Sequence, residues 1–491
     1  MNVGGASRAT VTLGLTAATI IAAFSAVAFH FGALGGIPHV SDEVVYVFQA
    51  RTLARGALAA PAPSPPEFFR YLNVVIEAGP GGRWFGIYPP GWPAALAPFV
   101  RAGAPWLANA LANALALLLI YRLGCEFFGR RVAALALLLG LLSPFAWAMG
   151  GSYLSHPMAL ALATLAMLGP TLGLRRDSVP LLALAGLAAG ALILVRPLDG
   201  AVVGLALAAL LLRNRMWKGV LVMAVAAAPG VVALGLYNRA LTGSLFLFPQ
   251  QLYIARDTLG FGGAVGKVAT YGTLGHTPAK AALNLGANLR SLATNLFGWP
   301  FLSFAFVPLA YFTRRRRWRR GLLLLSAVAA LFALAYGCYW YDGVMYGARF
   351  YYTLMPFWLL LSAAGITVAH RFAARRRLRP LVPALVVALF AFSFAVYVPH
   401  YVGKMRASYN LMDNRVYEAA ARAGVRAGVV LCPPLDRAYP SYGAVFWRNS
   451  PWLDTPVIWA KDLGPLDNQL RARYPDKEFW RYRGGRVERY D

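Results

Sequence analysis

Long runs of apolar residues alternate along the chain with short polar segments. A transmembrane helix needs about 20 mostly apolar residues. The runs that approach this length are residues 11–34, 106–123, 132–150, 156–174, 179–195, 199–212, 219–240, 299–313, 321–338, 352–369 and 381–398. The fifth and sixth runs are short and predict a tight hairpin. The pattern therefore predicts an all-α polytopic membrane protein with about 11 transmembrane helices.

The basic residues lie in the short segments between these runs. Lys and Arg accumulate in short cytoplasmic loops, and this bias sets the orientation of membrane proteins. With Arg8 inside and the spans alternating, five basic segments all fall on the cytoplasmic side: 124–131, 175–178, 213–218, 314–320 and 371–380. We therefore predict a multi-pass protein of the plasma (inner) membrane, with a cytoplasmic N-terminus and an extracytoplasmic C-terminus.

The acidic residues sort the opposite way. Only Glu126 and Asp177 fall on the cytoplasmic side. The extracytoplasmic side receives Asp42, Glu43, Glu67, Glu77, Asp199, Asp257, Asp342 and the acids of the C-terminal tail. Any carboxylate chemistry is therefore expected outside the cytoplasm.

Three extracytoplasmic regions are long enough to carry structure of their own. They are a first outer loop (35–105), a second outer loop (241–298) and a polar tail (399–491). We predict a transmembrane module over 1–398 and a separate C-terminal domain over 399–491.

The tail has the pattern of a small α/β domain. Residues 428–431 and 456–459 have the β-branched and aromatic character of strands, and 466–474 has a helical pattern. Residues 481–488 predict a hairpin, because Gly484 and Gly485 suit the positive φ angles of a tight turn.

The composition agrees with the membrane class. The chain is 59% hydrophobic and 13% charged, whereas soluble domains are about 25% charged. A net charge of +28 also occurs in nucleic-acid-binding proteins, but here the positive charges lie in loops between spans, so we expect no nucleic-acid partner. The run 11–34 resembles a signal peptide but is too long for one, so we predict a retained span.

The three cysteines are too few for a disulfide framework. A bridge between Cys338 and Cys432 stays open, although unpaired packing residues are the favoured interpretation.

The first candidate chemistry lies just after the first span, at Asp42 and Glu43. Ser41 is a good N-cap, and acids in the first turn suit the helix dipole. The predicted helix runs to about Arg55 and ends at Gly56. Because it looks amphipathic, we expect it on the outer membrane surface. An ionised carboxylate there is a candidate general base; the alternative is that both acids only stabilise the start of the helix.

The second candidate is the segment 84–93, in which Tyr88 and Trp92 flank Pro89-Pro90. The prolines and Gly91 interrupt any helix. Non-helical backbone at membrane depth lines a cavity or is buried in protein. The aromatic residues suit either a sugar-stacking wall or a simple elbow at the membrane surface.

Three further residues lie at predicted outer helix ends. Arg196 and Arg349 are functional candidates, because charge at a membrane interface is costly and a guanidinium group matches phosphate geometry. Snorkelling to headgroups, or pairing with Asp199 or Asp342, is the alternative. His156 begins the fourth span and is more typical of a structural hydrogen-bonding residue than of a ligand. The chain has neither the Cys/His spacing of a zinc site nor a nucleotide-binding fingerprint.

Taken together, these motifs resemble the GT-C glycosyltransferase superfamily, in particular the bacterial aminoarabinose and galacturonosyl transferases of lipid A and its core, and the protein O-mannosyltransferases. The resemblance covers about residues 1–400. Its motifs are, in order, Asp42-Glu43 with Tyr46, Pro89-Pro90, Ser155-His156-Pro157, Arg196-Pro197 and Tyr346-Gly347-Ala348-Arg349-Phe350.

The resemblance implies an enzyme that transfers a sugar, with inversion, from a polyprenyl-phosphate donor to a hydroxyl group of a lipid, glycan or protein acceptor. By analogy Asp42 is the general base, with Glu43 beside it, and Arg349 and Arg196 hold the phosphate. Substrate-pocket candidates are Tyr46, Tyr88, Pro89, Pro90, Trp92, His156 and Tyr346. The second outer loop is expected to close over the site as a lid.

The chain departs from the family pattern around the proline pair. Relatives often have acidic and lysine residues before it, where this chain has Ile87 and Tyr88, and a leucine after it, where this chain has Gly91. We therefore assign no cofactor, and a divalent metal stays open only through the resemblance.

Two other functions remain as alternatives. A transporter or flippase of a lipid-linked substrate would have a bundle of this size, although transporters usually show repeat symmetry and helices broken at the membrane midplane. A membrane glycan polymerase would also use outer arginines, but a leading Asp-Glu pair is less expected in it. Clustering of the polar residues at one face favours the transferase.

Overall fold

The computed structural model describes residues 8–176, 178–266, 275–434 and 442–490, and most of these are helical. Among them, six helices are long and apolar enough to cross a membrane, or seven if one bent pair is counted as a span. The bundle comprises α1 (Arg8–Gly32), α4 (Trp106–Phe127), α5 (Arg130–Leu141), α6 (Pro144–Gly151), α7 (His156–Arg176), α8 (Val179–Val195), α9 (Pro197–Arg213), α10 (Trp217–Thr242), α13 (Arg316–Gly337), α14 (Met355–Arg375) and α15 (Leu381–Phe392). The chain is a multi-pass membrane protein.

Every predicted span except 299–313 is mainly α-helical, and α8 matches its predicted range of 179–195. The span predicted at 132–150 is bent. Its two parts, α5 and α6, meet at an angle of 62°. Ser143 caps α6, because its side chain accepts a hydrogen bond from the Ala146 amide. The bend leads the chain into residues 152–155, which lie at the candidate site described below.

The prediction of a helical span at 299–313 is wrong. The segment consists of turns followed by a short 3-10 helix, η2 (Pro308–Phe312). Pro300 and Pro308 lack an amide donor, and Phe301 has a φ of 58°. The backbone amides of Ala305, Val307, Leu309 and Ala310 instead bond to carbonyls three residues earlier. The segment packs on α14, where a Cβ at Gly365 would lie 1.8 Å from the Phe306 carbonyl oxygen. Backbone polar groups are thus satisfied without an α-helix.

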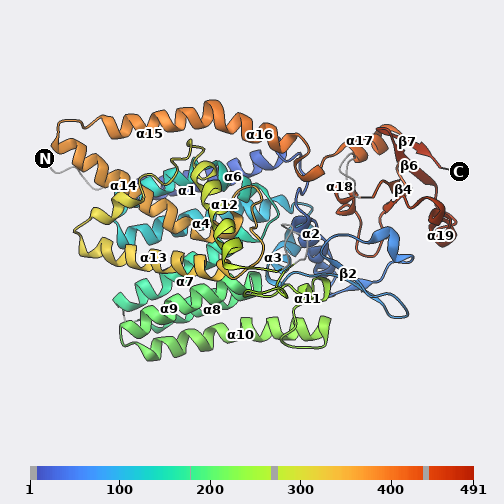
Figure 1. Cartoon of the computed structure of the whole chain (residues 1–491), viewed down its shortest axis with the longest axis horizontal. Coiled ribbons are helices and arrows are strands. Elements are labelled where there is room, and N and C mark those ends of the chain that lie inside the picture. Colours follow the sequence, from blue (N-terminus) through green and yellow to red (C-terminus); the bar gives the residue numbers. More distant parts are fainter. Residues whose placement is uncertain (1–7, 177, 267–274, 435–441, 491) are drawn as a thin grey trace.

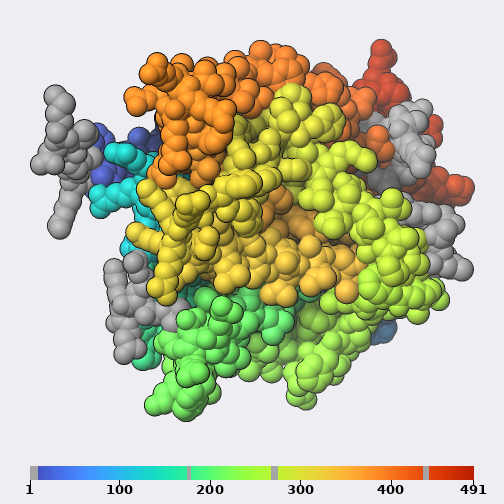
Figure 2. All heavy atoms as spheres, turned by 60° about the vertical axis from the view of Figure 1, so that its left-hand side comes forward, coloured from blue at the N-terminus to red at the C-terminus, as the bar shows by residue number. Residues whose placement is uncertain are grey.

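The basic segments gather at one end of the bundle, named here the basic end. Arg317 donates to the Cys125 carbonyl at 2.7 Å, and Arg371 lies over the Trp318 ring. The α9–α10 turn, the start of α13 and the α14–α15 turn lie at the same end, opposite the C-terminal strands (Figure 1). Viewed partly from this end, green α9–α10 and orange α14–α15 form opposite flanks, with yellow α13 between them (Figure 2). Asp177 of the predicted cytoplasmic segment 175–178 lies outside the described residues.

The last span continues beyond its predicted end. α15 passes through a π-helical turn, η4 (Ser393–Tyr397), into α16 (Val398–Arg406). The predicted domain boundary at 398/399 therefore lies inside one continuous helix.

The first outer loop forms structure at the other end, named here the site end. It contains α2 (Ser41–Ala54), α3 (Gly91–Arg101) and a small antiparallel sheet of β1 (Ala60–Pro61), β2 (Val74–Ile76) and β3 (Arg83–Gly86), in the order β1-β3-β2. The second outer loop contributes α11 (Pro249–Tyr253) and α12 (Pro278–Asn295).

The sequence predicted that α2 is an amphipathic helix on the membrane surface, and this prediction is wrong. It is apolar on two faces, and both are covered. Tyr46, Val47 and Ala50 belong to the core of the helical bundle, whereas Val44 and Phe48 belong to a second core shared with the C-terminal region. Its N-cap is Val40 rather than Ser41. Helix α2 therefore joins two cores.

The C-terminal region has the elements predicted from its sequence. Strands β4 (Gly428–Cys432), β5 (Val457–Lys461), β6 (Phe479–Arg483) and β7 (Arg486–Arg489) form a sheet in the order β5-β4-β6-β7, in which only β7 is antiparallel to its neighbour. Around it lie α17 (Arg415–Arg422), α18 (Gly443–Phe446) and α19 (Asp467–Arg473). All three cysteines are unpaired, so Cys338 and Cys432 form no bridge.

The C-terminal region is fixed to α2. The half-buried side chain of Arg51 donates to the Asn449 carbonyl at 2.8 Å and also to the Trp447 carbonyl. Burial lowers the pKa of Arg51 to about 10. Phe48 stacks on Phe446 of α18. These contacts place α2 between the bundle and the C-terminal sheet (Figure 1).

Candidate functional site

The start of α2 is organised by Glu43, the third residue of the helix. Its carboxylate accepts hydrogen bonds from the amides of His39 (3.0 Å) and Val40 (2.9 Å), which no helical carbonyl can reach. It also accepts from the Tyr153 amide (2.6 Å) and the Tyr346 hydroxyl (2.8 Å). The residue is completely buried. Burial raises the pKa of Glu43, and these hydrogen bonds oppose that shift.

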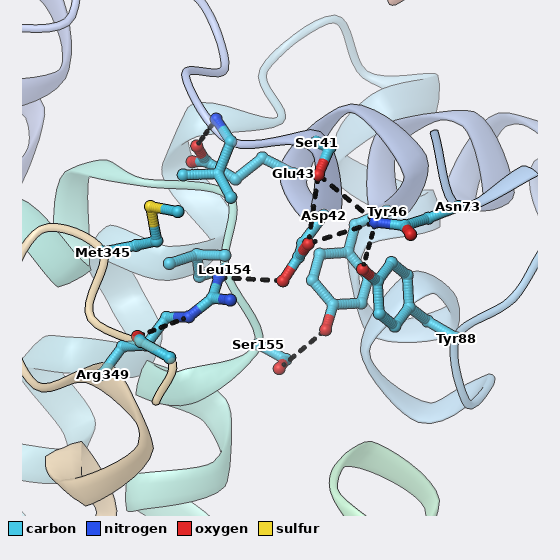
Figure 3. A network of polar contacts seen from close by, with 12 residues as sticks. Ser41, Asp42, Glu43, Tyr46, Asn73, Tyr88, Leu154, Ser155, Met345 and Arg349 are labelled. Atoms are coloured by element: carbon cyan, nitrogen blue, oxygen red, sulfur yellow. Dashed lines mark hydrogen bonds and ion pairs between the residues drawn. The ribbon is translucent and has the colours of Figure 1, made fainter. Parts of the chain in front are cut away.

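Asp42 points away from Glu43, because successive helical residues are about 100° apart around the axis. Its carboxylate forms an ion pair of 2.8 Å with Nη1 of Arg349, and its other oxygen lies 3.4 Å from the Asn73 side-chain nitrogen. The Asp42 side chain is 18% exposed, whereas that of Arg349 is 3% exposed. Figure 3 shows the two carboxylates pointing in opposite directions, with only Asp42 facing the arginine. Asp42 and Arg349 are therefore in direct contact.

Arg349 begins a short 3-10 helix, η3 (Arg349–Leu354), which leads into α14. Its Nε donates to the Gly343 carbonyl at 3.0 Å. Its Nη2 has no partner within the described parts of the chain. The preceding turn is held from α16, where the Tyr401 hydroxyl donates to the Tyr346 carbonyl at 2.5 Å. One donor of a rigidly held guanidinium group thus remains available.

Arg196 lies between α8 and α9 in a buried polar network. Its Nε is 3.2 Å from Asp199, as one alternative from the sequence proposed, and its Nη2 donates to the Tyr336 hydroxyl at 2.6 Å. Tyr336 and Thr353 in turn donate to the two oxygens of Asp199, at 2.5 and 2.6 Å. Asp199 is therefore fully bonded, and it fixes the orientation of the arginine.

Both arginines and His156 gather around the ring of Phe350. The guanidinium carbons of Arg349 and Arg196 lie 5.3 and 5.4 Å from its centroid, and the imidazole of His156 stacks on it at 6.3 Å. His156 is 1% exposed, and neither ring nitrogen has a hydrogen-bond partner in the described structure. Buried polar groups are nearly always hydrogen-bonded, and exceptions concentrate at functional positions. Both ring nitrogens of His156 therefore remain open to a hydrogen bond in the described structure.

Two of the predicted pocket residues lie beside Asp42. The rings of Tyr46 and Tyr88 lie 4.6 Å apart. The Tyr46 hydroxyl is 3.1 Å from that of Ser155, and the Tyr88 hydroxyl accepts a hydrogen bond from Asn73 at 2.9 Å. Burial and the nearby Asp42 carboxylate raise the pKa of Tyr46 to about 12 and that of Tyr88 well above its usual range. Both phenols therefore remain neutral near pH 7.

The other predicted pocket residues support these groups from behind. Trp92 is buried and donates to the Tyr153 carbonyl at 2.8 Å. The Tyr346 hydroxyl donates to the Glu43 carboxylate. Pro90 caps α3, and Pro89 precedes it in the turn. A Cβ at Gly91 would lie 2.6 Å from the backbone of Leu194, so the departure from leucine allows α3 to meet the end of α8.

Three contributors were not predicted from the sequence. Asn73 has a φ of 62° and bridges Asp42 and Tyr88. Tyr336 and Thr353 complete the shell around Asp199. An asparagine in a short loop is a weak signal, and nothing in the local sequence marks the other two.

The side chains of this site do not form a suitable set of ligands for a divalent metal ion. Such ions are held by several carboxylate or other oxygen ligands, and no group of three or more His, Cys, Asp or Glu side chains among the described residues is arranged to hold one. One oxygen of Asp42 is paired with Arg349, and Ile87 and Tyr88 offer no carboxylate.

No known protein family and no curated protein sequence matches the chain. Solved structures do match its fold. ArnT from Cupriavidus metallidurans, bound to undecaprenyl phosphate, matches with a TM-score of 0.56 and 15% identity, over 96% of this chain and 89% of that one. The apo state of the same protein gives a TM-score of 0.55.

The Archaeoglobus fulgidus oligosaccharyltransferase, in complex with Zn and sulfate, matches with a TM-score of 0.52 and 14% identity, over 79% of this chain and 53% of that one. Both neighbours belong to the GT-C superfamily. The chain therefore has the fold of GT-C transferases, as its motifs predicted.

Proposed function

We propose that the protein is a membrane glycosyltransferase that moves a sugar from a polyprenyl-phosphate donor to an acceptor hydroxyl group, with inversion at the anomeric carbon. The ion pair between Asp42 and Arg349, at the site end of the bundle, carries the proposal. It places a carboxylate and a phosphate-binding group 2.8 Å apart, beside buried aromatic residues. Such transfer needs a base and a stabilised leaving group together.

Asp42 acts as the general base. One oxygen of its carboxylate pairs with Arg349, and Asn73 holds the other. As the acceptor oxygen attacks the anomeric carbon, its proton passes to Asp42. The bond between the anomeric carbon and the phosphate oxygen breaks, and its electron pair leaves with polyprenyl phosphate.

Arg349, Arg196 and His156 stabilise the leaving phosphate. Arg349 has a free Nη2, and His156 has two unpartnered ring nitrogens in the described structure. Charge-assisted hydrogen bonds to phosphate are stronger than neutral ones, and they gain strength as charge develops on the leaving group. Because Asp199 and Tyr336 already orient Arg196, little reorganisation accompanies the reaction.

Glu43 positions the site rather than taking part in proton transfer, because it is completely buried and its two oxygens already accept four hydrogen bonds. The second outer loop acts as a lid, and two hydrogen bonds attach its described residues to the end of α13 and the segment after it. Trp340 donates to Asp257 at 2.6 Å, and a ring nitrogen of His276 lies 2.9 Å from the Gly337 carbonyl. Residues 267–274 of this loop lie outside the described ones.

The proposed topology has about 11 crossings of the plasma membrane, of which segment 299–313 crosses without an α-helix. The N-terminus and the basic end face the cytoplasm, following the positive-inside rule. The site end and the C-terminal domain (399–491) lie outside, where nucleotide sugars are normally absent and a lipid-linked donor is needed. In this topology the lipid-linked donor reaches the site from the bilayer, along the transmembrane module (1–398).

The direct test offers the purified, reconstituted protein a panel of synthetic polyprenyl-phosphate sugars. Release of polyprenyl phosphate from one donor, with the sugar appearing on an added acceptor, is expected. Movement of a labelled donor between leaflets without release would instead support a transporter. Use of a second lipid-linked glycan as the acceptor would support a polymerase.

Arg349→Gln is expected to lower kcat/KM for the donor about 10²- to 10³-fold, the usual effect of removing a group that stabilises developing charge. Arg349→Lys restores part of the loss, because it keeps the charge but not the fork that contacts both Asp42 and phosphate. Initial rates over a range of donor concentrations give the values. Arg422→Gln, in an exposed pair of the C-terminal region, is the control. Wild-type rates in Arg349→Gln would contradict the role.

His156→Phe is expected to stabilise the substrate-free protein and to slow transfer. The apolar ring can stack on Phe350 as the imidazole does. It also removes buried polar atoms that lack partners, which is expected to stabilise the folded state by about 1–2 kcal/mol. The same change deletes a hydrogen bond to the donor phosphate. Thermal unfolding and donor turnover are measured on one preparation. A less stable variant with unchanged turnover would make His156 a packing residue.

A further inference from the structure

A cavity of about 490 Å³ lies beside the site and is not used by the donor-binding groups described above. Three regions distant in sequence line it: the first outer loop (Arg70, Tyr71 and Val74), α11 (Tyr253) and the C-terminal region (Tyr442 and Lys461). Small-molecule sites are typically 300–1,000 Å³, so the volume suits one or two sugar units.

One loop separates the cavity from Asp42. Leu72 and Val74 line the cavity, and Asn73 between them contacts Asp42 and Tyr88. The Asp42 and Glu43 carboxylates also raise the pKa of Tyr71, although burial is the larger cause. Only this loop therefore stands between the cavity and the proposed base.

Two positive charges line this cavity, Arg70 from the loop and Lys461 from the end of β5. Burial and the neighbouring Arg70 lower the pKa of Lys461. Arg70 is exposed and Lys461 is half-buried, and within the described residues neither forms an ion pair with a carboxylate. Like charges that converge in a partly buried space favour an anion between them.

The remaining walls are aliphatic and aromatic, and two of the three tyrosine rings are firmly held. Tyr71 stacks on Phe446 with ring centroids 4.7 Å apart, and the buried Tyr442 donates to the Trp459 carbonyl at 3.2 Å. A Cβ at Gly443 would lie 2.5 Å from the Tyr71 hydroxyl, so only glycine leaves this ring in place. Rigid aromatic faces beside charged groups suit the apolar face and the anionic group of one sugar.

We propose that this cavity binds the acceptor, and that the acceptor is a glycan whose sugar carries a carboxylate or phosphate group. Arg70 and Lys461 bind the anionic group, Tyr71 and Tyr442 contact the ring, and a free hydroxyl points past Asn73 toward Asp42. The proposal rests on the transferase function, because it names the second substrate of that site. It also gives the C-terminal region a role in choosing the acceptor.

Binding is tested on the full-length purified protein in detergent, with glucose 6-phosphate and glucuronate as probes, and with glucose and inorganic phosphate for comparison. Titrations followed by saturation-transfer NMR give the Kd values. The two anionic sugars are expected to bind more tightly than either comparison compound. Lys461→Gln and Arg70→Gln are each expected to weaken binding at least about tenfold, as when a charge-assisted hydrogen bond is lost.

Arg486→Gln is the matched control, because it removes the same charge from an exposed position in the β6–β7 hairpin. Its Kd values are expected to equal those of the wild type. Unchanged binding in both cavity variants, absence of saturable binding, or equal affinity for inorganic phosphate and glucose 6-phosphate would each overturn the proposal.

The outcome is separable from that of the transferase proposal. Release of polyprenyl phosphate with water as the sugar acceptor needs Asp42 and the arginines but not the cavity, so it tests the transferase proposal by itself. If the wild type releases none from any donor, the transferase proposal fails while the binding data still decide whether the cavity takes anionic sugars. Release without anionic-sugar binding overturns the cavity alone.

Discussion

Asp42→Asn is expected to reduce sugar transfer about 10²- to 10⁴-fold, the range over which positioned bases accelerate proton transfer. The amide has nearly the same shape, and its oxygen can still accept a hydrogen bond from Arg349. It cannot accept a proton from the acceptor hydroxyl. Donor binding is expected to change little, because Arg349 remains in place through Gly343. The measurement is the rate of polyprenyl phosphate release with the acceptor at saturation.

Asp454→Asn provides the control for this variant. Asp454 pairs with Arg55 in an exposed position, so the same chemical change there is expected to leave the rate intact. Equal rates for wild type and Asp42→Asn would remove Asp42 as the base. A rate lost together with donor binding would show instead that Asp42 serves only to orient Arg349.

The helical spans were largely predictable because length and hydropathy decide them. Helix α8 was placed correctly because polar residues bound it at both ends, with Ser178 before it and Arg196 after it. The segment 299–313 has the same apolar composition, but composition does not record how a backbone hydrogen-bonds. Pro300 and Pro308 indicated that an α-helix would be interrupted here, and their effect on the backbone outweighed the apolar composition.

The candidate site was only partly predictable. Asp42 and Arg349 could be singled out, because each is a charge at the end of an apolar segment. Their pairing with each other rather than with nearer residues depends on the fold, since 307 positions separate them. Helix α2 was misplaced because its second face is buried in the core shared with the C-terminal region, which its local pattern cannot reveal.

The adjacent acid, Glu43, is expected to behave in the opposite way to Asp42. One oxygen of Glu43 accepts hydrogen bonds from His39, Val40 and Tyr346, and the other accepts from Tyr153 at 2.6 Å. In Glu43→Gln the amide nitrogen must face one of these donors. A buried donor without an acceptor costs about 1–3 kcal/mol, so a clearly lower unfolding temperature is expected in detergent.

Asp42→Asn and Glu43→Gln make the same chemical change at neighbouring positions, so each serves as the control for the other. If the two roles are as proposed, the first variant unfolds like the wild type and loses transfer, whereas the second unfolds earlier. The folded fraction of Glu43→Gln then transfers sugar at a rate much nearer to that of the wild type. A stable Glu43→Gln variant with no transfer would exchange the roles of the two acids. Because Glu43 also holds Tyr153 and Tyr346, that result would require these residues to move when substrate binds.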